Sequence, residues 1–153
     1  MSNEINEILP RLYLSGDSAA TNESTLTDRG ITHILNLTMN VPNKFSPELS
    51  YKQVSIVDGP GADTDEIQTH FKETFDFIES ALKQNAQNSV LVHCNAGISR
   101  SPSFVIAYLL QKWICRSYEE AYEHVKAARP IIKPNVTFVQ QLTKLEEANI
   151  DKN

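Results

Sequence analysis

Residues 93–101 read His93-Cys94-Asn95-Ala96-Gly97-Ile98-Ser99-Arg100-Ser101. They follow the short run Ser89-Val90-Leu91-Val92, which is typical of a buried strand. A mostly apolar segment from Phe104 to Ile114 comes next and predicts a helix. A loop that enters a helix points several main-chain N–H groups at one spot, where the helix dipole adds positive potential. The stretch therefore predicts a strand, an anion-binding loop and a helix, in that order.

Two side chains of this loop have the chemistry that a phosphate ester requires. Arg100, at the start of the helix, can bind two phosphate oxygens with its planar guanidinium. The same positive field favours the thiolate of Cys94, which is the nucleophilic form of the side chain. Gly97 permits main-chain conformations that a Cβ atom would resist. The alternative is a buried cysteine that lies near a surface arginine by chance. The presence together of His93, Cys94, Gly97, Arg100 and Ser101 argues against that alternative.

The pattern His-Cys-x-x-Gly-x-x-Arg-Ser resembles the signature of the cysteine-dependent protein tyrosine phosphatase superfamily. Three further segments resemble the small dual-specificity phosphatases and follow that family's order: 34–38, the strand ending at Asp58, and 128–142. The resemblance covers nearly the whole chain. It implies one catalytic domain over residues 1–153, without the docking domain of the mitogen-activated kinase phosphatases. It also implies hydrolysis of phosphotyrosine and of phosphoserine or phosphothreonine, with no metal and no cofactor.

The predicted mechanism begins with in-line attack of the Cys94 thiolate on phosphorus, which forms a phosphocysteine. Ser101 is expected to donate a hydrogen bond to the sulfur, and its alternative role is to satisfy an N–H group at the helix start. The resemblance implies that His93 supports the loop and tunes the thiol. The phosphate oxygens are expected to bind the loop N–H groups and the guanidinium, which belong to Asn95, Ala96, Gly97, Ile98, Ser99 and Arg100.

The general acid is predicted to be Asp58, which follows a strand where the family places its acid. Asp63 and Asp65 are rivals, because the spacing from Asp58 to Cys94 is a few residues longer than the family pattern. The extra residues are assigned to 59–64, and Asp63 is interpreted as a helix cap with Glu66 as its capping-box partner. Asn135 is predicted either to brace the phosphate loop or to cap the last helix.

Strands and helices alternate along the sequence, which predicts a single-domain α/β fold with a mainly parallel sheet and helices on both faces. A first strand or hairpin is expected over 8–14, a strand over 32–38, and a second inner strand over 51–57. A short helix is expected over 19–29, stopped by Gly30. Later helices are expected from a capping box at Ser117 and Glu120 and from Pro134 onward. The helix between the two inner strands and the motif carries an apolar stripe: Ile67, Phe71, Phe75, Ile78 and Leu82.

Composition narrows the function. The 153 residues carry a net charge of −5, which argues against nonspecific binding to nucleic acid or to anionic membranes. No apolar run is long enough to span a bilayer, and the first residues have no signal-peptide pattern. The chain is therefore expected in the cytoplasm, with the nucleus as an open alternative, and as a monomer.

The remaining cysteine and histidines suggest structural roles. Two cysteines give no disulfide framework, and the chemistry requires a free thiol in a reducing compartment. Cys115 is interpreted as a packed apolar side chain within the helix after the motif, the alternative being a resolving thiol for oxidised Cys94. His33, His70 and His124 lack metal-ligand spacing, so no metal is expected.

Three other functions would require different features in this sequence. Phosphoinositide or RNA 5′-phosphate hydrolysis is disfavoured because the variable loop positions are neutral: Asn95, Ala96, Ile98 and Ser99. A phosphoprotein-binding module without turnover should lack the nucleophile or the arginine, and both are present. A thiol redox protein should carry a Cys-x-x-Cys pair. The expected partner is therefore a phosphorylated protein, of which a kinase is one example.

Overall fold

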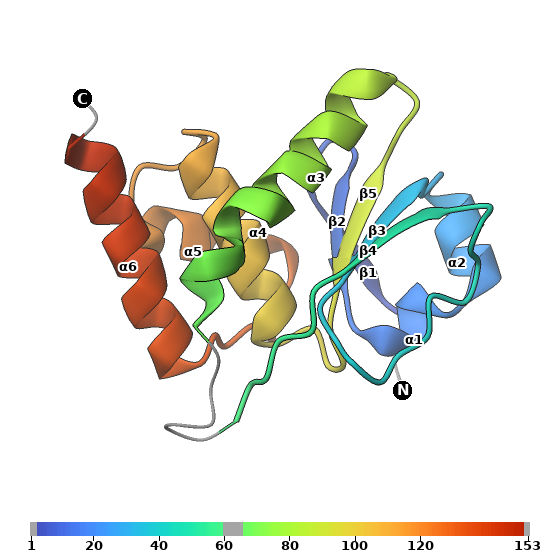
Figure 1. Ribbon diagram of the computed structural model, residues 1–153, viewed down its shortest axis with the longest axis horizontal. Helices are drawn as coiled ribbons and strands as arrows, with labels where there is room; N and C mark the ends of the chain where they lie inside the picture. The colour runs from blue at the N-terminus through green and yellow to red at the C-terminus, as the bar shows by residue number, and fades with distance from the viewer. Residues whose placement is uncertain (1–2, 60–65, 152–153) are drawn as a thin grey trace.

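The computed structural model describes residues 3–59 and 66–151. Within them, a five-stranded sheet lies between two groups of helices (Figure 1). One face of the sheet is covered by two short helices, α1 (Asp17–Ala20) and α2 (Glu23–Asp28). The other face is covered by α3 (Phe71–Gln84), α4 (Arg100–Gln111) and α5 (Tyr118–Ala128), and α6 (Val136–Asp151) packs against α4 and α5 on the side away from the sheet. The predicted α/β fold with helices on both faces is confirmed.

The sheet has the strand order β1-β2-β5-β3-β4. Its strands are β1 (Ile5–Leu9), β2 (Leu12–Ser15), β3 (His33–Asn36), β4 (Ser50–Gln53) and β5 (Val90–His93). β1 and β2 form the expected hairpin, and the other pairs are parallel. The register aligns Ser15 and Asn36 with His93, so the carboxyl ends of three parallel strands meet at one edge. The chain leaves β5 at the centre of that edge.

The core forms between the sheet and the four longer helices. All residues of β5 are buried because the strand has a neighbour on each side and helices above and below. The predicted apolar stripe is confirmed: Ile67, Phe71 and Ile78 are buried, and Phe75 and Leu82 pack against them. Ile67 belongs to a short 3-10 helix, η2 (Ile67–His70), which leads into α3. Within the described ranges, no helix combines the length and apolarity that crossing a bilayer requires.

Two predictions about the first half of the chain are wrong. The segment 51–57 is not an inner strand. β4 ends at Gln53 and is the last strand in the order of the sheet, where it pairs with β3 alone, while β5 pairs with the opposite side of β3. The segment 19–29 is not one helix but parts of α1 and α2. The side chain of Asn22 accepts a hydrogen bond from the N–H of Thr25 and so begins a second helix. Gly30, at φ +66°, does end α2 as expected.

Two further corrections concern helix ends. Glu66 has extended main-chain angles and precedes η2, so it cannot be the capping-box partner inside a first turn. Asp63 itself lies outside the described residues. α4 ends at Gln111 and not at Ile114, because the chain turns at Trp113, where φ is +65°. Cys115 therefore lies beyond the helix, although it is buried in the core as predicted.

Candidate active site

The predicted strand, loop and helix are present. Cys94 directly follows β5, residues 95–99 form the loop, and Arg100 is the first residue of α4. Figure 1 shows that α4 and α6 begin at the same lower end of the molecule at which β5 finishes. The loop therefore lies at the carboxyl edge of the parallel strands, where open α/β sheets commonly bind ligands.

The Cys94 sulfur sits among hydrogen-bond donors. The side chain is only 2% exposed. Its Sγ atom accepts from the N–H of Gly97 at 3.3 Å and from the N–H of Ser101 at 3.4 Å. The Ser101 hydroxyl lies 3.2 Å from the same sulfur. Donors directed at sulfur stabilise the thiolate more than the neutral thiol, which has little need of them.

The carbonyl groups of the loop all point away from this sulfur to outside donors. The carbonyl of Asn95 accepts from the N–H of Asp17 at 2.8 Å. The guanidinium of Arg129 donates to the carbonyls of Ala96 and Gly97. The carbonyl of Ile98 accepts from the N–H of Lys133 at 2.7 Å, and that of Ser99 from Ser103. In a trans peptide the C=O and the next N–H point in opposite directions. The N–H groups of residues 96–100 therefore face inward, as a bound phosphate requires.

Gly97 is the loop position at which no other residue fits. Its φ is +69°, which disfavours any side chain. A Cβ atom there would lie 2.7 Å from the Arg129 guanidinium and 2.8 Å from the main-chain N of Gly16. Gly16 and Arg129 can therefore approach the loop this closely only because position 97 has no side chain.

The Arg100 guanidinium is held across the loop by two acceptors. One terminal nitrogen donates to the carbonyl of Ile56 at 3.0 Å, and the other donates to Oδ1 of Asn95 at 2.6 Å. These contacts fix the plane of the guanidinium, so less side-chain entropy is lost when phosphate binds. They also connect the loop to the segment that carries Asp58.

Asp58 and Asn135 are in contact. Asp58 is exposed, and its Oδ1 accepts a hydrogen bond from the side-chain amide of Asn135 at 2.8 Å. The main-chain N–H of Asn135 donates to Oγ of Ser99 at 2.9 Å, while its Oδ1 caps α6 through the N–H of Thr137. Asn135 therefore contacts the loop and caps α6, which are the contacts that the two predicted alternatives require. Asp63 and Asp65 lie outside the described residues, so their rivalry with Asp58 stays open.

Arg129 is a site residue that the sequence did not single out. It is 4% exposed, and its Nε donates to the Gly97 carbonyl at 2.8 Å. A terminal nitrogen also donates to Oδ1 of Asn6 at 2.7 Å and lies 3.5 Å from Glu4. Burial lowers the pKa of Arg129, and the charges of Glu4 and Cys94 oppose that shift. The sequence does hold one signal for Arg129: it is a cation directly after an amphipathic helix, within a segment that resembles the family.

His93 is the last residue of β5 and directly precedes Cys94. Its Nδ1 is 3.1 Å from the carbonyl of Cys94, and because a carbonyl only accepts, this nitrogen carries the proton. Burial lowers the pKa of His93, which favours the neutral imidazole. The contact agrees with the predicted supporting role. Among the described residues, no cluster of His, Cys, Asp or Glu side chains is arranged to hold a metal ion.

The two cysteines should differ in reactivity. They are almost equally buried, at 2% and 3% exposed, so accessibility does not separate them. Burial, then the nearby Glu120, raises the pKa of Cys115 to about 11. We expect iodoacetate at pH 6 to modify Cys94 well before Cys115, as measured by mass spectrometry of tryptic peptides. Equal labelling would show that the donors around Cys94 do not stabilise its thiolate.

The predicted alternative role of Cys115 does not fit this arrangement. The two cysteines are at opposite ends of α4, one before its first residue and one after its last. A helix of 12 residues is about 18 Å long. Disulfide partners need Cα atoms within about 7 Å of each other. Cys115 therefore cannot resolve an oxidised Cys94 in this conformation.

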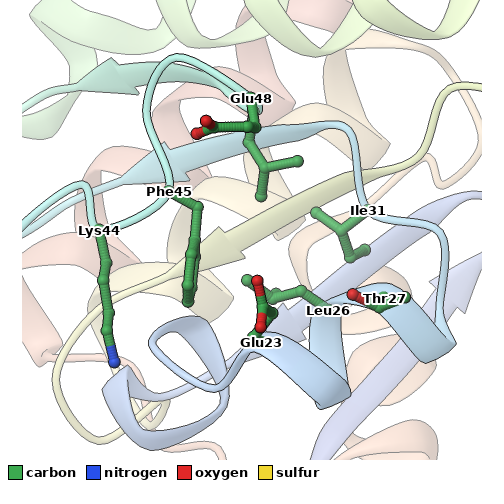
Figure 2. Close-up of a pocket in the computed structure, with 8 residues that line it drawn as sticks. Glu23, Leu26, Thr27, Ile31, Lys44, Phe45 and Glu48 are labelled. Carbon is green, nitrogen blue, oxygen red and sulfur yellow. The ribbon is translucent and has the colours of Figure 1, made fainter.

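A separate cavity of about 380 Å³ lies between α2 and the segment 44–49 (Figure 2). Figure 2 shows Lys44 and Phe45 on one side of it, and Leu26, Thr27 and Ile31 on the other. None of the residues predicted for phosphate chemistry lines it. A second hollow, of about 430 Å³, is lined by Asp17 and Asn40, both of which contact the side chain of Asn95. That hollow therefore adjoins the phosphate loop.

The sequence is similar to known phosphatases. Residues 12–148 match the family model described as "Dual specificity phosphatase, catalytic domain". Dual specificity protein phosphatase 1 of Homo sapiens is 41% identical over 140 residues, which are 92% of this chain and 36% of the relative. Protein phosphatase Slingshot homolog 3 of Homo sapiens is 39% identical over 137 residues, 90% of this chain and 20% of the relative. The chain thus spans about a third or less of the length of these relatives.

Solved structures are similar over almost their whole length. Human DUSP28 has a TM-score of 0.84 at 31% identity, covering 94% of this chain and 93% of that one. The human tyrosine phosphatase-like serine/threonine/tyrosine-interacting protein has a TM-score of 0.85 at 35% identity, covering 97% and 99%. The fold and the order of its elements are therefore those of small phosphatase domains.

Proposed function

Since this chain belongs to the dual specificity phosphatase family, we propose that it hydrolyses phosphate monoesters of tyrosine and of serine or threonine in proteins. The observation that carries the proposal is the loop whose inward N–H groups surround the Cys94 sulfur at the start of α4. We also propose that residues 1–153 form one catalytic domain, which the family match over residues 12–148 supports.

In the first step, the Cys94 thiolate attacks phosphorus in line with the ester oxygen. The Sγ–P bond forms as the P–O bond to the substrate breaks. Asp58, in its protonated form, gives its proton to the departing oxygen and becomes a carboxylate. The N–H groups of residues 96–100 and the Arg100 guanidinium bind the three equatorial oxygens as charge moves onto them.

In the second step, the Asp58 carboxylate takes a proton from a water molecule whose oxygen attacks phosphorus. The P–Sγ bond breaks, and inorganic phosphate and the Cys94 thiolate result. The Ser101 hydroxyl, 3.2 Å from Sγ, donates a hydrogen bond to the leaving sulfur. Asn135 holds the Asp58 carboxyl group beside the loop, which supports its use in both steps.

Replacing Arg100 with lysine tests the phosphate-binding arrangement. Lysine keeps the charge but cannot contact two phosphate oxygens together with the acceptors that orient Arg100. We expect kcat/KM for an aryl phosphate to fall by roughly 10²-fold or more, as for the loss of one oxyanion donor. The measurement is steady-state hydrolysis, with phosphate inhibition as a separate measure of binding. A change of less than threefold would mean that Arg100 does not bind the phosphate.

The competing functions differ in what they require of the loop. A binding module without turnover does not need Cys94 as a nucleophile, although one similar structure is named as a phosphatase-like interacting protein. Hydrolysis of phosphoinositides or RNA 5′-phosphates favours extra cations in the loop, where the exposed positions Ala96 and Ile98 are uncharged. A phosphorylated protein, such as a kinase, is therefore the proposed partner. A monomer in the reducing cytoplasm or nucleus fits a free thiol at the site.

The deciding experiment is hydrolysis of a substrate panel by the purified protein. The panel contains phosphotyrosine, phosphothreonine and doubly phosphorylated Thr-x-Tyr peptides beside phosphoinositide vesicles and a 5′-phosphorylated RNA. We expect phosphate release from the peptides at kcat/KM values well above those for the lipid and the RNA. Faster release from either of those two substrates would overturn the protein-substrate proposal.

A further inference from the structure

Large apolar side chains are exposed around the phosphate loop. Among the described residues, the exposed large apolar side chains are Met39, Val57, Ile98, Trp113, Ile114, Ile131 and Val136, with exposed fractions from 36% to 73%. Single exposed apolar residues are ordinary, but a group of them in one place marks a binding surface. Five of the seven belong to segments that are hydrogen-bonded to the loop or are part of it.

Two of the five lie on the side of the loop where α6 begins. Ile131 lies in the turn between Arg129, which donates to the Gly97 carbonyl, and Lys133, whose N–H donates to the Ile98 carbonyl. Val136 directly follows Asn135, whose N–H donates to the Ser99 hydroxyl. Ile131 and Val136 are therefore one or two positions along the chain from a residue that contacts the loop directly.

The other three belong to the loop or to segments that contact its residues at other points. Ile98 is part of the loop itself. Val57 stands between Ile56, whose carbonyl accepts from Arg100, and Asp58. Met39 precedes Asn40, whose side chain is 3.4 Å from that of Asn95 and lines the adjoining hollow. We call Met39, Val57, Ile98, Ile131 and Val136 the apolar collar.

The collar has no net charge. The charged residues within its segments, 39–40, 56–58 and 131–136, are Asp58 and Lys133, one of each sign. A substrate segment lying across the loop would therefore meet apolar side chains on several sides and balanced charge between them. Charge alone would select neither an acidic nor a basic peptide here, so burial of apolar area is the main source of preference.

We propose that the apolar collar selects phosphorylated segments that carry bulky apolar side chains on both sides of the phosphorylated residue. The inference rests on the proposed function, since it names the substrates of the same site. The phosphate fixes the position of the substrate over Cys94, and its neighbours on either side then reach the collar. Leucine, isoleucine, valine, methionine and phenylalanine are the flanking residues that bury the most apolar area there.

The test compares two phosphotyrosine peptides of equal length. One has leucine or valine at the two positions before and after the phosphotyrosine, and the other has serine and glutamine there. The wild-type protein should show a kcat/KM about tenfold higher for the apolar peptide. The double variant Ile131→Ser with Val136→Ser should lose most of this preference. It should hydrolyse a small aryl phosphate within twofold of wild type, because neither side chain is part of the proposed chemistry.

A matched control comes from the other end of α4. Trp113 and Ile114 are also exposed, at 39% and 40%, but follow the last residue of a 12-residue helix that begins at the loop, about 18 Å away. Trp113→Ser with Ile114→Ser should leave the peptide preference unchanged.

Three results would overturn the inference. These are equal hydrolysis of both peptides by the wild type, a preference that survives in the collar variant, or an equal loss in the control variant. The proposed function would remain after each of them. It would fail instead if the wild type hydrolysed the aryl phosphate but no phosphopeptide.

Discussion

Cys94→Ser should abolish turnover and leave phosphate binding intact. The hydroxyl of serine is far less acidic than a thiol, so the variant has no nucleophile at neutral pH, while the inward N–H groups remain in place. The carbonyl contacts that orient them involve Asp17, Arg129 and Lys133 and do not include the sulfur. Steady-state hydrolysis of an aryl phosphate should fall below detection. Titration with a phosphotyrosine peptide should still show binding of wild-type strength.

Cys115→Ser provides the matched control. It also replaces a buried thiol with a hydroxyl, but in the core beyond α4, so it should lower stability without removing activity. Turnover near the wild-type value in the Cys94 variant would exclude the phosphocysteine mechanism. Loss of both turnover and binding would show instead that the sulfur is needed to hold the loop together.

Asp58→Asn should slow the hydrolysis of substrates with poor leaving groups far more than that of substrates with good ones. The alkoxide of threonine is a strong base, so phosphothreonine needs a proton on the departing oxygen, whereas an activated phenol hardly does. The expected loss for poor leaving groups is roughly 10²–10⁴-fold, the usual worth of general acid catalysis. The measurement is kcat/KM across a series of aryl and alkyl phosphates.

Asp63→Asn and Asp65→Asn are the controls, because these carboxylates are the rivals of Asp58 in the sequence. They should leave the dependence on the leaving group as it is in the wild type. A steep dependence in the Asp63 variant, with none in the Asp58 variant, would mean that the longer loop has moved the acid.

The central strand, loop and helix could be predicted because their information is local. The apolar run of β5, the spacing of Cys94 and Arg100, and the apolar segment of α4 lie within about one supersecondary unit. The N-cap at Ser117 is confirmed for the same reason: its side chain accepts from the N–H of Glu120, three residues on. Such signals need no knowledge of what packs where.

The errors arose where the outcome depends on distant partners. The sequence of β4 predicts an inner strand because it does not show that β5, almost forty residues later, occupies the other side of β3. The sequence predicts too late an end for α4 because Trp113 adopts a positive φ, which is rare for a bulky residue and has no sequence signal. The contact between Asn135 and Asp58 joins positions 77 residues apart. The contacts of Arg129 have no local signal, because its acceptors Gly97 and Asn6 lie 32 and 123 residues away along the chain.

The contacts of Arg129 affect how the domain unfolds. One buried guanidinium joins the end of α5, the phosphate loop and the first strand, through Gly97 and Asn6. Unwinding the end of α5 would remove the donor from the carbonyls of Ala96 and Gly97, and loss of β1 would remove the Asn6 acceptor that orients this donor. Asp17 and Lys133 would still hold the carbonyls of Asn95 and Ile98. The shape of the loop therefore depends on elements that are distant from it in the sequence, so catalytic activity should fall as soon as the end of α5 unfolds.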